Sequence, residues 1–127
     1  MAKISTRNIT AKNVEDIMGT AAYGGITYWA VEPSQADFDA APAGAHTIRD
    51  GDPDEDVSGV YYLTPAKIKQ AVVEIGEGKH TGNMITGYVQ AAFRDWNAED
   101  GIDCGEIDAD AADCIVQVAC FGSVVYG

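Results

Sequence analysis

Positive charge is scarce in this sequence, and it is missing altogether from its final part. Eight Lys and Arg residues stand against twenty Asp and Glu residues among 127, which gives a net charge of −12. No Lys, Arg or His follows Arg94. Nucleic acids and anionic membranes would repel such a chain, so neither is expected as a direct partner. The charge favours solubility, a basic protein partner or cation binding.

Long apolar runs and paired cysteines are also lacking. No apolar stretch approaches the roughly 20 residues of a membrane helix. The N-terminal MAKISTRNITAK has no apolar core of the kind found in signal peptides. The three cysteines are odd in number and form no CxxC pair, which argues against a disulfide scaffold and a zinc ribbon. We therefore expect a soluble, cytoplasmic protein in which Cys104, Cys114 and Cys120 are small core residues.

Catalytic and metal-binding motifs are equally scarce. The stretch GEGKHTGN, residues 76–83, departs from the GxxxxGK[ST] order of a phosphate-binding loop and follows a predicted helix rather than a strand. The acidic turn DGDPDED, residues 50–56, begins like a calcium loop, but Glu55 stands where that loop needs glycine. His46 and His80 have no HxxxH or HExxH partner. The sequence predicts no enzyme, no cofactor and no metal site, and an enzyme built on either histidine stays an alternative.

Apolar spacing and capping residues predict the order of the elements. A helical stripe over 11–22 predicts a first helix that ends at Gly24 in a left-handed conformation. Thr64-Pro65 is a strong helix start, and a final helix is capped by Asp108 or Asp110. That final helix is apolar nearly all round and should lie deep in the fold. The other expected elements are strands over 26–32, 46–50, 57–64 and 123–126 and a helix over 83–96.

This order of elements predicts the fold class. Helices and strands do not alternate as in a parallel α/β protein, so an α+β arrangement is expected. We predict one domain over residues 1–127, with a small, mainly antiparallel sheet of about four strands covered by about four helices. The apolar VVY near the end would complete this sheet, or pair with a second copy and give a homodimer.

Acidic residues concentrate late in the chain, with eight of them between positions 95 and 113. Carboxylates three or four residues apart on a helix lie about 5–6 Å from each other, which is close to the spacing of phosphates along a nucleic-acid strand. A basic protein groove that holds nucleic acid would accept such a surface in its place. The alternative is an ordinary solvated face. The candidate partner-binding carboxylates are Asp95, Glu99, Asp100, Asp103, Glu106, Asp108 and Asp110.

Aromatic residues concentrate in the stretch AAYGGITYWAVEP, which begins at Ala21. As a strand, its 26–32 portion would be apolar on both faces, so it is either buried on both sides or presents one face to a partner or ligand. Aromatic side chains are frequent anchors of interfaces. The candidate aromatic contacts for a partner or ligand are Tyr23, Tyr28, Trp29 and, later in the chain, Trp96.

Two segments, GGITYW near the start and AADCIVQVACFGSVVYG at the end, resemble segments of small acidic proteins encoded by phages and prophages. In those proteins a GGIxYW-like segment and a terminal DADxIVQxAxFGxVxYG-like segment recur. The resemblance implies a phage accessory protein that acts in the cytosol of a bacterial host. It brings no catalytic residue with it. Small acidic proteins in that setting often bind and disable host machinery, including nucleic-acid-directed defence complexes.

Taken together, these observations predict a non-enzymatic inhibitor that binds the basic surface of a host protein or nucleoprotein complex. Such a protein would be an acidic nucleic-acid mimic, similar to an anti-CRISPR. The alternative is a module that binds a small ligand, such as a signalling nucleotide, through the YGGITYW aromatics with Lys79 or Arg94. That alternative needs a concave, partly basic pocket.

Overall fold

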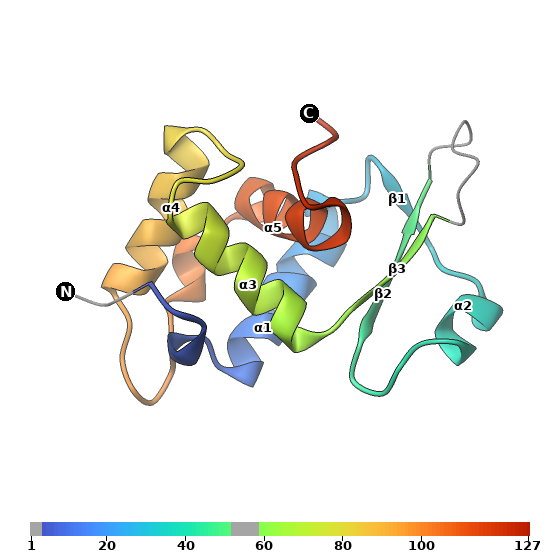
Figure 1. Cartoon of the computed structure of the whole chain (residues 1–127), viewed down its shortest axis with the longest axis horizontal. Coiled ribbons are helices and arrows are strands. Elements are labelled where there is room, and N and C mark those ends of the chain that lie inside the picture. Colours follow the sequence, from blue (N-terminus) through green and yellow to red (C-terminus); the bar gives the residue numbers. More distant parts are fainter. Residues whose placement is uncertain (1–3, 52–58) are drawn as a thin grey trace.

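The computed structural model describes residues 4–51 and 59–127, and these form five α-helices and a three-stranded antiparallel sheet. Four helices pack together on one side of Figure 1, while the sheet and one short helix lie on the other. The α+β class predicted from the sequence is confirmed. The helices are α1 (Ala11–Thr20), α2 (Gln35–Asp39), α3 (Pro65–Gly76), α4 (Asn83–Arg94) and α5 (Ala109–Phe121), and the strands are β1 (Ala30–Val31), β2 (His46–Asp50) and β3 (Val60–Leu63).

All the helices described above except α4 begin at a residue whose side chain caps them. Thr10 starts α1 through a capping box, in which Thr10 and Asn13 each bond the other's backbone amide through their side chains. Thr64 caps α3 directly before Pro65. Of the two caps predicted for α5, Asp108 is the one that accepts the backbone hydrogen bond. These starts agree with the predictions from the sequence.

Helix α5 occupies the centre of the fold, because it packs against α1, α3, α4 and β3. Its middle residues are buried, as its almost entirely apolar sequence predicts. Gly122 ends it in a left-handed conformation with φ of 78°. None of the helices in the described residues is long and apolar enough to cross a membrane.

The hairpin predicted from the sequence is present. Strands β2 and β3 pair antiparallel, with His46 opposite Leu63 and Arg49 opposite Val60. The acidic turn 50–56 that joins them lies mostly outside the described residues. Its resemblance to a calcium loop therefore stays untested.

Two predicted strands do not form as expected. Residues 26–29 make a turn in which the Ile26 carbonyl accepts hydrogen bonds from the amides of Trp29 and Ala30. Only the two residues of β1 remain of the predicted strand 26–32. The predicted strand 123–126 is not a strand, because its amides bond to a side chain of α5 instead of a sheet edge. The sheet accordingly has three strands rather than about four.

The end of α1 widens into a π-helical turn, Ala21–Gly25. Gly24 has φ of 168°, which is extended backbone, so the predicted left-handed stop at this residue is wrong. Gly25 has a packing role, because a Cβ there would lie 2.7 Å from the carbonyl oxygen of Ala109. Glycine is therefore what lets the end of α1 touch the start of α5.

Asp113 on α5 is a buried carboxylate held by three neutral donors. One of its oxygens accepts hydrogen bonds from the indole of Trp29 at 2.7 Å and from the amide of Gln117 at 2.9 Å. The other accepts from the hydroxyl of Tyr28 at 2.7 Å. Buried polar groups need such partners, because an unsatisfied one is costly. These bonds fix the turn at 26–29 against the middle of α5.

Gln117, one helical turn later, holds the C-terminal segment in the same way. Its carbonyl oxygen accepts hydrogen bonds from the amides of Val125 and Tyr126, both at 2.8 Å. The Tyr126 ring stacks on Trp29 with centroids 5.5 Å apart, and its hydroxyl bonds to Asp50 of β2. We call the linked side chains the Asp113 network: Tyr28, Trp29, Asp113, Gln117 and Tyr126.

The contact between α1 and α5 predicts opposite effects for two glycines. Gly25→Ala should lower the free energy of unfolding by about 2 kcal/mol, because its methyl group collides with the α5 backbone. Gly19→Ala, within α1 itself, meets nothing within 4 Å and should raise the free energy of unfolding by up to about 1 kcal/mol through helix propensity. Denaturant unfolding measures both values. Equal effects of the two substitutions would contradict the packing role of Gly25.

The Asp113 network predicts a large difference between two aspartates of α5. Asp113→Ala should cost about 3 kcal/mol, because it leaves the buried indole donor of Trp29 without an acceptor and removes one of the hydrogen bonds of the Gln117 amide. The matched control Asp110→Ala removes an exposed carboxylate from the first turn and should cost less than about 1 kcal/mol. Chemical denaturation followed by circular dichroism tests this. A cost below about 1 kcal/mol for Asp113→Ala would show that the network is not what holds the two ends of the chain.

Candidate functional site: an aromatic groove beside an acidic hollow

The aromatic candidates take different positions in the fold. Tyr23 is 96% exposed and Trp96 is 36% exposed. Trp29 is only 5% exposed, so its predicted role as a contact for a partner or ligand is wrong, and it is a core residue. Tyr28 is 56% exposed, but its hydroxyl bonds inward to Asp113. Tyr23 is therefore the candidate whose whole side chain is presented to solvent.

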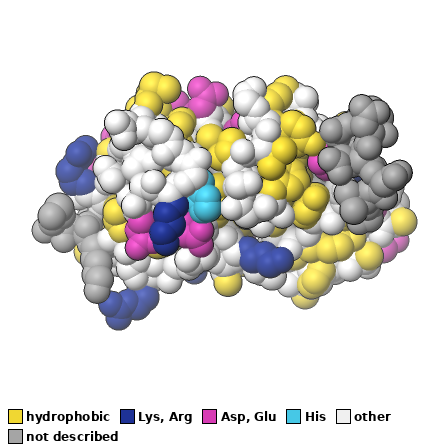
Figure 2. All heavy atoms as spheres, turned by 45° about the horizontal axis from the view of Figure 1, so that its top comes forward, with side chains coloured by type: hydrophobic (Ala, Val, Ile, Leu, Met, Phe, Trp, Pro, Cys, Tyr) yellow, Lys and Arg dark blue, Asp and Glu magenta, His cyan; other side chains and the backbone are white. Residues whose placement is uncertain are grey.

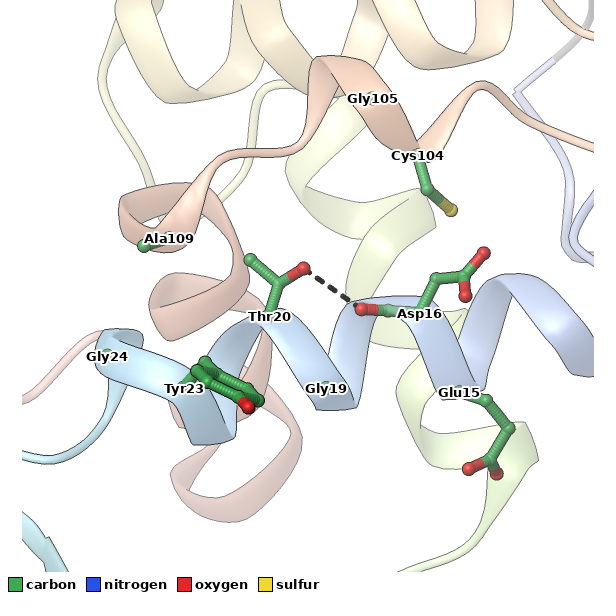
Figure 3. Close-up of a pocket in the computed structure, with 9 residues that line it drawn as sticks. All are labelled: Glu15, Asp16, Gly19, Thr20, Tyr23, Gly24, Cys104, Gly105 and Ala109. Carbon is green, nitrogen blue, oxygen red and sulfur yellow. Dashed lines mark hydrogen bonds between the residues drawn. The ribbon is translucent and has the colours of Figure 1, made fainter.

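A groove of about 690 Å³ runs beside Tyr23, and we call it the Tyr23 groove (Figure 3). Helix α1 and its π-helical turn form one wall, and the Cys104–Glu106 turn with the start of α5 forms the other. Cys104 points from the second wall toward α1. Glycines on both walls leave space for a ligand. The lining residues are Glu15, Asp16, Gly19, Thr20, Tyr23, Gly24, Cys104, Gly105 and Ala109.

A second hollow of about 440 Å³ adjoins this groove, and we call it the acidic hollow. It shares Asp16, Cys104 and Gly105 with the Tyr23 groove. Four carboxylates and one ammonium group line it, so its charge is strongly negative. The charged lining residues are Lys12, Asp16, Asp95, Asp100 and Asp103.

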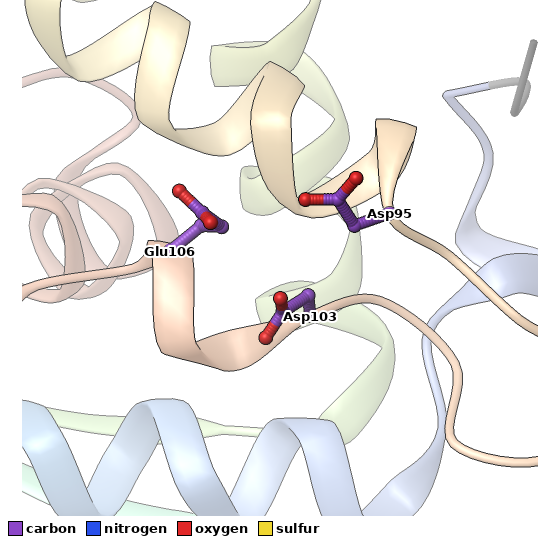
Figure 4. A group of neighbouring side chains, drawn as sticks. All are labelled: Asp95, Asp103 and Glu106. Carbon is purple, nitrogen blue, oxygen red and sulfur yellow. The ribbon is translucent and has the colours of Figure 1, made fainter.

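Three carboxylates beside the acidic hollow gather closely. Asp95, Asp103 and Glu106 each place an oxygen within 4.8 Å of the other two (Figure 4). Oxygen ligands of this kind suit a divalent cation such as Ca²⁺ or Mg²⁺. Asp95 and Asp103 are exposed, however, and exposed acidic groups commonly meet without an ion. The absence of a metal site therefore stays a prediction.

The structure thus separates the seven acidic candidates. Four of them, Asp95, Asp100, Asp103 and Glu106, lie in one continuous region. Glu99 is exposed in the same loop. The side chain of Asp108 caps α5 by accepting a hydrogen bond from a backbone amide, and Asp110 lines a different hollow, beside Tyr28. The region therefore holds most, but not all, of the predicted carboxylates.

The loop that carries these acids is tied to α1 by buried hydrogen bonds. The Asn13 side chain, 3% exposed, accepts from the Ile102 amide and donates to the carbonyls of Asp100 and Ile102. Gly101 fits here with φ of 76°, and a Cβ at that position would collide with Asn13. Asn97 closes the loop by accepting from the Asp100 amide at 2.7 Å. The acidic hollow is consequently fixed in shape by the backbone.

Cations of the chain itself neutralise this region only in part. Lys12 bonds to Asp16 at 2.9 Å, and Arg94 lies 3.9 Å from Asp95. The face in Figure 2 is different: there acidic side chains gather around a basic side chain and a histidine. Among the ion pairs of the α3–α4 region are Glu74 with His80 and Glu77 with Lys79. At the acidic hollow, Lys12 and Arg94 thus face more carboxylates than they can neutralise.

The histidines and thiols show little sign of catalytic activation. His46 bonds to Glu15 at 3.1 Å and His80 to Glu74 at 2.8 Å, and these pairs lie on different elements. Burial raises the pKa of the Cys104 thiol to about 11. The thiol that faces the Tyr23 groove is therefore protonated at neutral pH, and a protonated thiol is a poor nucleophile.

The sequence did not point to Glu15, Asp16 and Asn13 as parts of the site. They lie on α1, far before the acidic loop in the sequence, and only the fold brings them to it. A signal was nevertheless present. Glu15 and Asp16 interrupt the apolar stripe of α1 and so occupy its outer side.

Comparisons of the chain with protein families, curated proteins and solved structures gave no match. Its function is therefore inferred from the geometry of the Tyr23 groove and the acidic hollow.

The position of Tyr28 predicts an unusual titration. Removal of its hydroxyl from water, together with the hydrogen bond to Asp113, raises the pKa of Tyr28 to about 12. Near-ultraviolet absorbance should show an ionisation step near pH 12 that Tyr28→Phe removes and Tyr23→Phe leaves in place. Because the folded state favours the protonated form, stability should fall as pH rises from about 10, the unfolded value, to about 12. An undiminished absorbance change near pH 12 in Tyr28→Phe would contradict the assignment.

Proposed function

We propose that this protein is a non-enzymatic phage or prophage accessory protein that binds and inhibits a host complex with a basic surface. It occupies that surface as an acidic mimic of nucleic acid, in the manner of an anti-CRISPR. The observation that carries the proposal is the acidic hollow, where Asp16, Asp95, Asp100 and Asp103 face a single ammonium group. The likeness of both chain ends to phage proteins supports the biological setting.

The arrangement of the carboxylates suits this role physically. Charges that converge on one hollow sum their fields, which attracts a basic partner and speeds association. Asn13 and Asn97 hold the loop in place before any partner arrives, so less entropy is lost on binding. A scattered set of the same acids would lack both advantages.

The second candidate function, binding of a signalling nucleotide, receives less support. A nucleotide phosphate requires a basic or amide-rich pocket. The Tyr23 groove is lined by Glu15 and Asp16, and neither Lys79 nor Arg94 is among its lining residues. An anionic ligand would therefore be repelled at the groove that Tyr23 borders.

Capture of host proteins from bacterial cytosol, with the purified protein as bait, tests the proposal. Proteins bound at low salt should elute as salt rises, because the screening length shrinks from about 10 Å at 0.1 M to about 3 Å at 1 M. Added DNA should release the same proteins by competition. Retention that is independent of salt and of DNA would contradict the proposal.

Two triple variants make the test specific for the acidic hollow. Both lose three negative charges, so their net charges are equal. The variant with substitutions at the acidic hollow, which we call the hollow variant, should no longer capture the host proteins. The distant control, with substitutions at exposed acids elsewhere, should still capture them and release them when DNA is added. Equal behaviour of the two would show that only the overall charge matters. The hollow variant is Asp95→Asn, Asp100→Asn, Asp103→Asn, and the control is Glu32→Gln, Asp39→Asn, Glu77→Gln.

A further inference from the structure

We propose that the Tyr23 groove receives an arginine side chain of the basic partner, and that the guanidinium stacks on the Tyr23 ring. The inference rests on the proposed function, because it names how the same partner is anchored. It adds a residue-specific contact to an attraction that would otherwise depend on charge alone. Three features carry it: the presentation of Tyr23, the charge of the groove and its continuity with the acidic hollow.

Tyr23 is held out into solvent by a fixed backbone. Its neighbour Ala21 is fully buried, and Gly25 is packed against α5. The ring between them is 96% exposed and has no hydrogen bond within the described residues. Single π-helical turns of this kind are frequent at functional sites. An aromatic ring presented on rigid backbone loses little entropy when a partner covers it.

The charge of the groove selects a cation as the occupant. Glu15 and Asp16 stand on the same wall as Tyr23 (Figure 3). His46 bonds to one oxygen of Glu15, and Lys12 pairs with Asp16, so both carboxylates are partly engaged. The side chain of Glu15 is nevertheless 67% exposed and keeps its second oxygen for a partner. A cation above the ring therefore meets the π-face of Tyr23 in a negatively charged groove, with the Glu15 carboxylate about 12 Å further along the helix axis.

Arginine fits an exposed aromatic ring in a negative groove better than lysine. Its guanidinium is planar and weakly hydrated, so it stacks on the aromatic face while its positive charge suits the groove. The ammonium of lysine is a strongly hydrated point charge and gains less from stacking. Gly19 and Gly24 meet nothing within 4 Å where a Cβ would stand, which leaves space along the groove for the long stem of the side chain.

The groove also continues into the surface that attracts the partner. Asp16, Cys104 and Gly105 line both the Tyr23 groove and the acidic hollow. One basic segment that crosses these shared residues would place one arginine at the ring and its other cations at the hollow. A second copy of this chain is a poor occupant, because two surfaces with the same negative charge repel each other. An apolar segment would leave the carboxylates of the walls without a partner.

The test uses two short peptides of equal length and charge, one with arginine and the other with lysine at every basic position. Binding to the full chain is measured by fluorescence anisotropy at low salt. The arginine peptide should bind more tightly. Tyr23→Ala should weaken that peptide roughly two- to five-fold, the range expected for an exposed cation–π contact, and affect the lysine peptide less. NMR titration should shift the Tyr23 ring resonances.

Two matched variants control for general effects. Tyr23→Phe keeps the ring and should keep the preference for arginine. Phe38→Ala removes another exposed aromatic ring, 49% exposed on the distant helix α2, and should change neither affinity. Because Tyr23 is so exposed, its variants should fold normally, which circular dichroism checks.

The outcomes separate this inference from the proposed function. If the hollow variant weakens both peptides but Tyr23→Ala weakens neither, the arginine site is overturned and the acidic surface stands. An arginine preference that survives in Tyr23→Ala also overturns it, as does tighter binding of an apolar peptide of the same length. If neither basic peptide binds the wild type at low salt, both the inference and the proposed function fail.

Discussion

A buried carboxylate with neutral donors sets the constraint on which this fold depends. Burial of a charge costs several kcal/mol unless hydrogen bonds replace its water, and Asp113 obtains three of them from Tyr28, Trp29 and Gln117. Two of these donors lie in the turn at 26–29 and the third lies on α5. Neither segment can move away without removing hydrogen bonds from the buried carboxylate. The close contact of Gly25 with α5 extends the same constraint to the end of α1. The position of the Tyr23 groove therefore follows from a network in the core.

Local signals were sufficient for the four longer helices and insufficient for the short helix α2, which was not expected from the sequence, and for two of the strands. Helix starts depend on a cap and its next few residues, and these can be read directly from the chain. The stretches 26–32 and 123–126 have the apolar and β-branched composition of strands. The backbone of 26–29 instead closes a turn on the Ile26 carbonyl, and the amides of Val125 and Tyr126 bond to Gln117 of α5. The Trp29 side chain in that turn bonds to Asp113, 84 residues away, and no local pattern reveals such a contact.

The candidate site shows the same division between local and distant information. The sequence alone shows that acids are abundant after residue 94. Only the packing of α1 in the fold places Asp16 beside them. The two segments GGITYW and AADCIVQVACFGSVVYG contain every residue of the Asp113 network, while the acidic loop 95–106 lies outside them. The likeness to phage proteins that we predict from these segments would therefore concern the framework. The acidic loop that we propose to bind a partner lies outside both segments.

Gln117 contacts the C-terminal segment through the main chain, since its oxygen accepts from the backbone amides of Val125 and Tyr126. Recognition of backbone places no demand on the side chain at position 125, and Val125 is 58% exposed. That position is accordingly free to change in evolution or by design while the segment keeps its path. It offers a tolerant point for a spectroscopic label or a new surface residue, one that leaves the core undisturbed.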